Sequence, residues 1–233
     1  MSVTIKSEHE IELMREAGRL LAMMHEELHK EIKPGMSTWD IDHLGETIIR
    51  DYGCTPNFLN YNGYPASVCT SVNDEVVHGI PSKKRILQEG DIISLDCGLI
   101  YKGYHSDAAR TWGVGEISAE AQRLIDVTKQ SFFEGIKYAR EGNHLFDISS
   151  AIGRYAESFG YGVVRDLCGH GIGNALHEAP EIPNYAMNRK GVLLKAGMTL
   201  AIEPMINIGG WEVDWMDDDW TVVTRDHSLS AHY

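Results

Sequence analysis

The sequence predicts an α+β fold made of two copies of one unit, and three observations support this. Apolar residues recur at helical spacing in two pairs of segments, and short β-branched stretches follow each pair. The two halves also match at a fixed offset of 107 residues, as between Gly35 and Gly142 (142 − 35 = 107). This order predicts helices backing a curved antiparallel sheet with pseudo-twofold symmetry. Because no Pro/Gly/Ser-rich linker separates the halves, residues 1–233 are expected to form a single domain with repeat halves of about 1–110 and 111–233.

The first half contains two predicted helices followed by strands. Helical spacing runs over 8–30, where Ser7 and Glu10 form a capping-box pattern. A second helix is predicted over 38–52 with Ser37 as its N-cap. Short apolar or β-branched stretches separated by turn formers then predict strands over 68–72, 75–78 and 91–100.

The second half repeats this order, with helices predicted over 119–140 and 147–159 and short strands after Gly160. The constant offset carries Asp96, at the end of DIISLD, onto Glu203, at the end of MTLAIE. A structural repeat alone predicts apolar residues at such strand ends. Two equivalent carboxylates therefore indicate a shared central site. Further matched positions are Asp40 and Asp147, Ile41 and Ile148, Gly53 and Gly160, Leu87 and Leu194, and Gly90 and Gly197.

Composition excludes some classes of function. Hydrophobic residues make up 43% of 233 residues, and no apolar run approaches the roughly 18 residues that would span a bilayer. A net charge of −13 opposes general binding to nucleic acids or anionic membranes. Four widely spaced cysteines and an N-terminus without an apolar segment predict reduced thiols and a cytoplasmic location.

Four residues suggest a metal site. Lys102 and Gly103 form a plausible hairpin turn, which would place Asp96 and Asp107 on one face of two paired strands. Taken alone, such a pair is more often two solvated aspartates than a metal site, and a lone histidine is more often structural than a ligand. With His170 among glycines and Glu203 in AIEPM, however, the oxygen and nitrogen donors suit Mn, Fe, Co or Zn, and carboxylates can bridge two such ions.

These motifs carry a resemblance to a known family. With VVHGIP, SLDCG, GYHSDAAR, CGHGIG, LHEAP and IEPM in this order, the sequence closely resembles the type I methionine aminopeptidases of the pita-bread fold, in their short, bacterial-like form. The resemblance implies metal-dependent removal of the initiator methionine from nascent proteins and peptides. It also implies two divalent ions, one held by Asp96 and Asp107 and the other by Asp107, His170 and Glu203.

The resemblance also implies roles around the metals. Glu203 would accept a proton from the attacking water, His177 would stabilise the oxyanion, and His78 would hydrogen-bond the scissile amide. An additional monovalent cation would contact main-chain oxygens of Asn73, Glu75 and Ser230. Six other histidines are read as structural or solvated: His9, His25, His29, His43, His105 and His227.

A methionine pocket needs apolar walls that tolerate a thioether. Tyr61, Tyr64 and Cys69 are candidates from the YNGYPASVC segment, and the resemblance adds Phe58, Leu176 and Trp220. Nothing beside Cys69 supplies a catalytic triad, so a cysteine nucleophile is not expected. Cys97 follows Asp96 on a strand and should point away from the metals.

Two alternatives stay open: a proline-specific peptidase of the same fold, and a binding module with impaired catalysis. The expected partners are the N-terminal methionine of peptides and nascent chains, with a transient ribosome contact that the acidic stretch 212–220 disfavours. No nucleic-acid specificity, no membrane and a monomer are expected. The family pattern continues after SAHY with a strand bearing a glutamate that bridges both ions. The 233-residue polypeptide is therefore expected to bind its metals more weakly than one extended by that strand.

Overall fold

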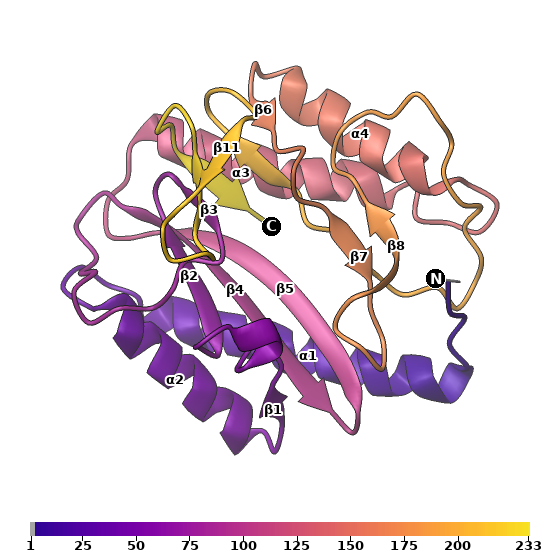
Figure 1. Cartoon of the computed structure of the whole chain (residues 1–233), viewed down its shortest axis with the longest axis horizontal. Coiled ribbons are helices and arrows are strands. Elements are labelled where there is room, and N and C mark those ends of the chain that lie inside the picture. The colour runs from indigo at the N-terminus through magenta and orange to yellow at the C-terminus, as the bar shows by residue number, and fades with distance from the viewer. Residues whose placement is uncertain (1–2) are drawn as a thin grey trace.

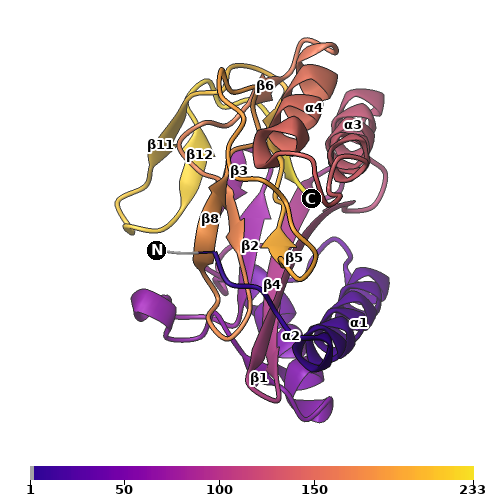
Figure 2. The same cartoon turned by 90° about the vertical axis from the view of Figure 1, so that its right-hand side faces the viewer.

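The computed structural model describes residues 3–233, in which four helices cover one side of a layer of strands (Figures 1 and 2). The helices of the first half, α1 (Glu8–Glu31) and α2 (Thr38–Asp51), lie together at the bottom of Figure 1. Those of the second half, α3 (Ala119–Ile136) and α4 (Leu145–Glu157), lie together at the top. The helix–helix–strand order confirms the predicted α+β class.

Local sequence fixes the helix starts. Ser7 and Glu10 form the predicted capping box on α1, and Ser37 caps α2 in the same way with Asp40. The predicted end of α3 at Arg140 is wrong, because the helix ends at Ile136. Beyond Ile136 the backbone hydrogen bonds span three residues instead of four, because the Tyr138 N–H donates to Gly135 O at 3.0 Å. This tighter turn leads towards Gly142.

The first half forms a four-stranded sheet of β1 (Thr55–Pro56), β2 (Val68–Val72), β4 (Ile92–Tyr101) and β5 (Tyr104–Gly113). The β4–β5 hairpin has the predicted register, with Tyr101 opposite Tyr104 and Gly98 opposite Asp107. A short 3-10 helix, η1 (Tyr61–Gly63), lies between β1 and β2.

The remaining strands form three short sheets rather than extending one curved sheet. One contains β3 (Glu75–Val77), β11 (Val213–Trp215) and β12 (Val222–Thr224), so the two halves pair directly. The second contains β6 (Gly162–Val163), β10 (Met205–Asn207) and β13 (Ser230–His232). The third contains β7 (Gly169–Gly171), β8 (Glu178–Ile182) and β9 (Leu200–Ala201). Strand β3 ends one residue before the predicted end at His78, whose φ of 59° breaks the extended backbone.

Equivalent contacts recur in the two halves. The Gly35 N–H donates to Leu87 O at 2.8 Å, and the Gly142 N–H donates to Leu194 O at 3.1 Å. Isolated bridges join Ser37 to Ile86 and His144 to Leu193, which are again 107 residues apart (144 − 37 = 193 − 86 = 107). The duplication is therefore preserved at the level of individual hydrogen bonds.

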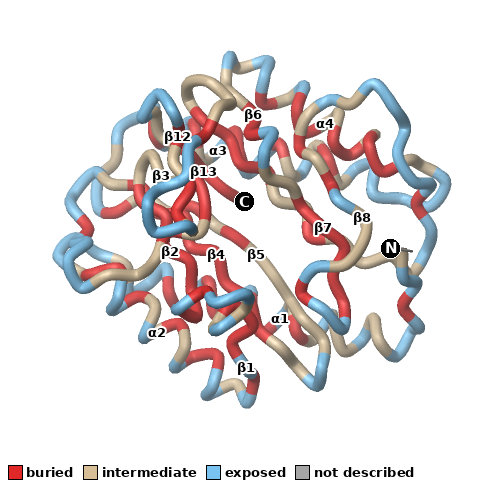
Figure 3. The backbone as a smooth tube through the Cα atoms, viewed as in Figure 1, coloured by how far each residue is buried: buried red, intermediate tan, exposed pale blue. Residues whose placement is uncertain are grey.

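Buried segments concentrate where the helices face the strands (Figure 3). On α1 the buried apolar residues include Leu21, Met24 and Leu28, which join Ile93 and Leu95 of β4 in one core cluster. No helix within residues 3–233 is long and apolar enough to cross a lipid bilayer.

Candidate active site

One cavity of about 220 Å³ gathers the residues predicted to bind the divalent metals, to act in catalysis and to line the methionine pocket. Its lining includes the four predicted metal ligands, the two predicted catalytic histidines and the whole predicted methionine pocket: Phe58, Tyr61, Tyr64, Cys69, His78, Asp96, Asp107, His170, Leu176, His177, Glu203 and Trp220. The histidines predicted to be structural lie outside this lining. A larger cavity of about 670 Å³, bordered by α1, β5 and α3, shares Asp107 but none of the other ligand candidates.

Asp96 and Asp107 meet because of the β4–β5 register. Asp96 pairs with Ala109, and Asp107 pairs with Gly98, so the two side chains are diagonal neighbours on one face. Burial, reinforced by the neighbouring Asp107, raises the pKa of Asp96 well above its ordinary value. Two such carboxylates are unfavourable as a pair of bare anions, and a cation between them would remove the conflict.

The second half supplies His170 and Glu203 to the same place. His170 lies on β7, and its Nε2 is 3.2 Å from Glu203 Oε1 and 3.6 Å from Asp107 Oδ2. Its Nδ1 lies 2.8 Å from Gly171 O, which leaves Nε2 facing the carboxylates. Burial acts to lower the pKa of His170, but the neighbouring carboxylates of Asp107 and Glu203 raise it to about 11.

The chemistry of these side chains fits a divalent metal. Glu203 Oε1 is buried and, despite lying near His170 Nε2, has no hydrogen bond of acceptable geometry to any residue in 3–233. Three largely buried carboxylates and one imidazole form the mixed donor set typical of Mn, Fe, Co or Zn sites. Within residues 3–233, no three His, Cys, Asp or Glu side chains are already arranged around an ion position.

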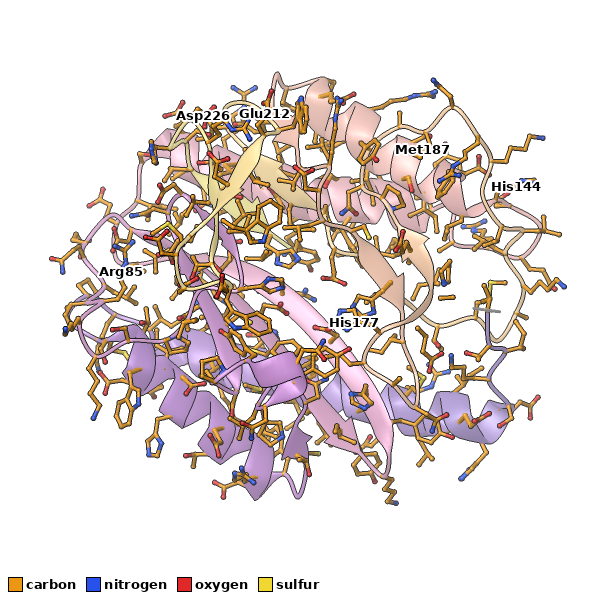
Figure 4. The ribbon with its side chains drawn as sticks, viewed as in Figure 1. Arg85, His144, His177, Met187, Glu212 and Asp226 are labelled. Atoms are coloured by element: carbon orange, nitrogen blue, oxygen red, sulfur yellow. The ribbon has the colours of Figure 1, made fainter. Side chains whose placement is uncertain are left out.

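His78 and His177 flank the carboxylates from different elements. His78 follows β3 in a left-handed conformation that is unusual for a residue with a side chain, and its ring meets Trp220 edge-on at 6.2 Å. His177 precedes β8, close to the lower end of β7 in Figure 4. Tyr61 Oη lies 2.9 Å from His177 Nδ1, and the His177 ring lies 4.1 Å from that of His170. Burial lowers the pKa of both His78 and His177, which favours neutral imidazoles at neutral pH.

Apolar and aromatic side chains form the opposite wall. Phe58, Tyr64, Cys69 and Leu176 are buried in one cluster, against which Trp220 packs. The Tyr64 hydroxyl donates to Gly79 O at 2.9 Å, which fixes the ring beside the cavity. Burial raises the pKa of the Cys69 thiol well above its ordinary value, so the thiol stays protonated and poorly nucleophilic at neutral pH. Cys97 is fully buried in the core of the first half, away from this lining.

Sequence reasoning missed two residues here. Asn62 of η1 contributes to the lining. His232, on β13, is buried with its Nε2 3.8 Å from Glu203 Oε2. The pairing of His232 with Met205, two residues beyond Glu203, creates this contact, and no motif around His232 signals it.

Of the three residues predicted to contact a monovalent cation, Asn73 and Glu75 lie at or just before the start of β3, and Ser230 begins β13. The Ser230 N–H donates to Asn73 O at 2.9 Å, which joins two of the three backbones. Glu75 begins β3, and its side chain accepts from the Val72 N–H at 2.7 Å.

Comparison with known proteins shows the family of this chain. A model of metallopeptidase family M24 matches residues 12–225. A protein of Clostridium acetobutylicum named methionine aminopeptidase is 56% identical over 231 residues, which cover 99% of this chain and 92% of that protein. A solved methionine aminopeptidase of Thermotoga maritima superposes with a TM-score of 0.97 at 44% identity, covering 99% of this chain and 93% of that one. A Xaa-Pro dipeptidase of Bacillus anthracis, at 24% identity and a TM-score of 0.74, is similar in fold alone over 97% of this chain and 61% of its own.

Proposed function

The chain belongs to metallopeptidase family M24, and from that membership we propose how its cavity removes the N-terminal methionine of proteins and peptides. The chain has the pita-bread fold and is a metal-dependent aminopeptidase. The residues that carry out the reaction are our proposal. Its main support is that carboxylates and histidines from both halves of the duplication converge on one cavity beside an apolar wall.

We propose that Asp96 and Asp107 hold one divalent ion and that Asp107, His170 and Glu203 hold a second. The donor set and the unpartnered Glu203 Oε1 support this assignment. Such ions supply Lewis-acid polarisation of a carbonyl and a water activated at neutral pH. The same donors accommodate Co, Mn, Fe or Zn.

The protein groups around the substrate divide the remaining tasks. Glu203 accepts the proton of the attacking water, because its Oε1 lies 3.2 Å from His170 Nε2 and has no hydrogen-bond partner within residues 3–233. His177, held through Nδ1 by Tyr61, directs Nε2 towards the developing oxyanion. His78 donates to or accepts from the scissile amide, and its strained backbone conformation supports a functional placement.

Substrate selection follows from the shape of the cavity. Phe58, Tyr64, Cys69, Leu176 and Trp220 surround a space that suits one unbranched side chain with a polarizable sulfur. The carboxylate end of the cavity favours a substrate with a free amino terminus, which makes the reaction exopeptidic.

Several wider expectations belong to the same proposal. Residues 3–233 act as one catalytic unit, because each half supplies ligands to one site. The enzyme works as a cytoplasmic monomer on nascent chains near the ribosome, in keeping with four free cysteines. The paired backbones of Asn73 and Ser230 support a monovalent cation near Glu75.

The decisive experiment is release of free methionine from the tripeptide Met-Ala-Ser with added divalent metal. Asp96→Asn is expected to lower kcat/KM by more than about 100-fold, since even groups that only support metal ligands contribute 10- to 100-fold. The matched control is Asp51→Asn at the exposed end of α2, which should retain full activity. Release unaffected by a chelator or by Asp96→Asn would exclude the proposed site. Faster cleavage of Gly-Pro than of Met-Ala-Ser would favour a proline-specific enzyme.

A further inference from the structure

The N-terminal arm, residues 3–7, makes a nearly buried ionic contact with the residue next to His177. Lys6 Nζ lies 2.5 Å from Glu178 Oε2, and the two side chains are only 4% and 14% exposed. The Thr4 hydroxyl donates to the same carboxylate oxygen at 2.6 Å, and Lys6 Nζ also contacts Thr4 Oγ1. The backbone of the arm is fixed as well, because the Lys6 N–H donates to Gly197 O at 2.8 Å.

Glu178 closes a turn over residues 171–178 that connects β7 to β8, here called the histidine turn. Glu178 Oε1 accepts from the Ala175 N–H at 3.3 Å. Gly173 packs so closely that a Cβ there would lie 2.4 Å from Lys6 Cε and 2.6 Å from Glu178 Oε1. On its other side the histidine turn is held by β5, because the His105 N–H donates to Gly173 O at 2.8 Å.

The charge pair cannot lose one member without consequence. Burial opposes ionisation of Glu178, yet the hydrogen bonds from Lys6 and Thr4 hold its pKa below the ordinary value. Removing the ammonium would leave a largely buried carboxylate without its cation. The carboxylate would then turn towards water. Its hydrogen bond from the Ala175 N–H and its packing against Gly173 would be lost.

We propose that Lys6 is a positioning residue, which acts through Glu178 and the histidine turn to hold His177 over the cavity. Lys6 does not touch the substrate space, whereas His177 lines it. Among residues 3–233, the side chain of His177 has one hydrogen-bond partner, Tyr61, so the position of its backbone depends on the histidine turn. The proposal rests on the role assigned to His177 above.

A double-mutant cycle tests the proposal. Lys6→Met, measured on Met-Ala-Ser with added metal, should lower kcat about 10- to 100-fold with little change in KM, as expected for a misplaced catalytic group. In a His177→Ala background the same change should alter kcat less than about twofold, because the group that Lys6 positions is gone. Equal losses in both backgrounds would overturn the proposal.

A second measurement does not depend on activity. Hydrogen exchange of the metal-free protein should show faster exchange of the Ala175 amide in Lys6→Met, with core amides of β4 unchanged. Lys6→Arg, which keeps the charge, should restore slow exchange and most of kcat. Unchanged exchange at Ala175 in Lys6→Met would contradict the proposed link.

The matched control is Lys137→Met, which breaks an exposed pair with Glu134 on the surface and should change neither measurement. If the unmodified protein releases no methionine, the proposed function fails. The exchange experiment still shows whether Lys6 holds the histidine turn through Glu178. If the unmodified protein is active and the cycle is additive, only the role of Lys6 fails.

Discussion

At the scale of single residues, the surroundings of a carboxyl group decide what it does. Asp96 is buried beside Asp107, and both effects raise its pKa, because an anion without a compensating cation is unfavourable there. Glu10, at the exposed start of α1, accepts from the Ser7 N–H and hydroxyl and from the Tyr104 hydroxyl, and its pKa falls to about 2. The first carboxylate is a proposed metal ligand, and the second stabilises the fold.

Glu10 gives a pH-dependent prediction. Because its pKa is lowered from 4.5 to about 2, its stabilising effect is complete above pH 4.5 and is lost as the pH falls towards 2. Glu10→Gln should therefore lower the free energy of unfolding at pH 7, and the difference from the unmodified protein should shrink at pH 3. Urea titrations at the two pH values measure this difference.

Glu12→Gln is the control for this experiment, because Glu12 lies on the same helix in an exposed pair with Arg15. Its effect should be small and nearly independent of pH. A Glu10→Gln deficit that is the same at pH 3 and pH 7 would show that the capping charge is not its source.

At the scale of elements, β4 and α1 differ in how much space they leave for a side chain at a glycine. Gly98 on β4 lies against Asn57, whose Nδ2 donates to Ser106 O at 3.1 Å across the hairpin, and a Cβ on Gly98 would lie 2.0 Å from Asn57 Oδ1. Gly18 lies within α1, where a Cβ would meet only Ser106 Oγ, at 3.8 Å. The strand needs its glycine for close packing, whereas the helix does not.

We expect opposite effects of the same substitution at these positions. Gly98→Ala should destabilise the protein by about 1–3 kcal/mol through overpacking against Asn57. Gly18→Ala should stabilise it by about 0.5–1 kcal/mol, because alanine restricts the unfolded chain and suits a helix. Urea unfolding monitored by circular dichroism measures both. Stabilisation by Gly98→Ala would contradict the packing described for the hairpin.

At the scale of the whole molecule, the proposed metal site joins the two halves. Asp96 and Asp107 come from the β4–β5 hairpin, whereas His170 and Glu203 come from the second half. Pairing of β3 with β12 also joins the halves, but through few residues. Metal binding should therefore stabilise the molecule as a unit rather than one half.

Thermal unfolding tests this coupling. Metal at about 100 times its Kd should stabilise the folded state by about 2.7 kcal/mol and raise Tm in one cooperative transition. A chelator should reverse the shift, and Asp96→Asn should abolish most of it, whereas Asp51→Asn should preserve it. Two separate transitions, of which metal moves only one, would contradict a shared site.

The sequence by itself determined the features that depend on near neighbours in the chain. Ser7, Glu10 and Ser37 predict their helix caps, Lys102 and Gly103 predict the β4–β5 register, and the constant offset predicts the duplication. The ordered motifs also identified the residues that line the cavity. Proteins that share these motifs share a fold, so the resemblance indicates which distant residues come together.

Only the tertiary structure decided the features that depend on packing between distant segments. It split the expected curved sheet into four, ended α3 at Ile136 and brought His232 against Glu203. It also joined Lys6 to Glu178 across 172 residues of sequence. Caps and hairpins are set by hydrogen bonds within a few residues. A buried ion pair or a strand partner is instead selected by competition among all segments for the same interior, which no local pattern records.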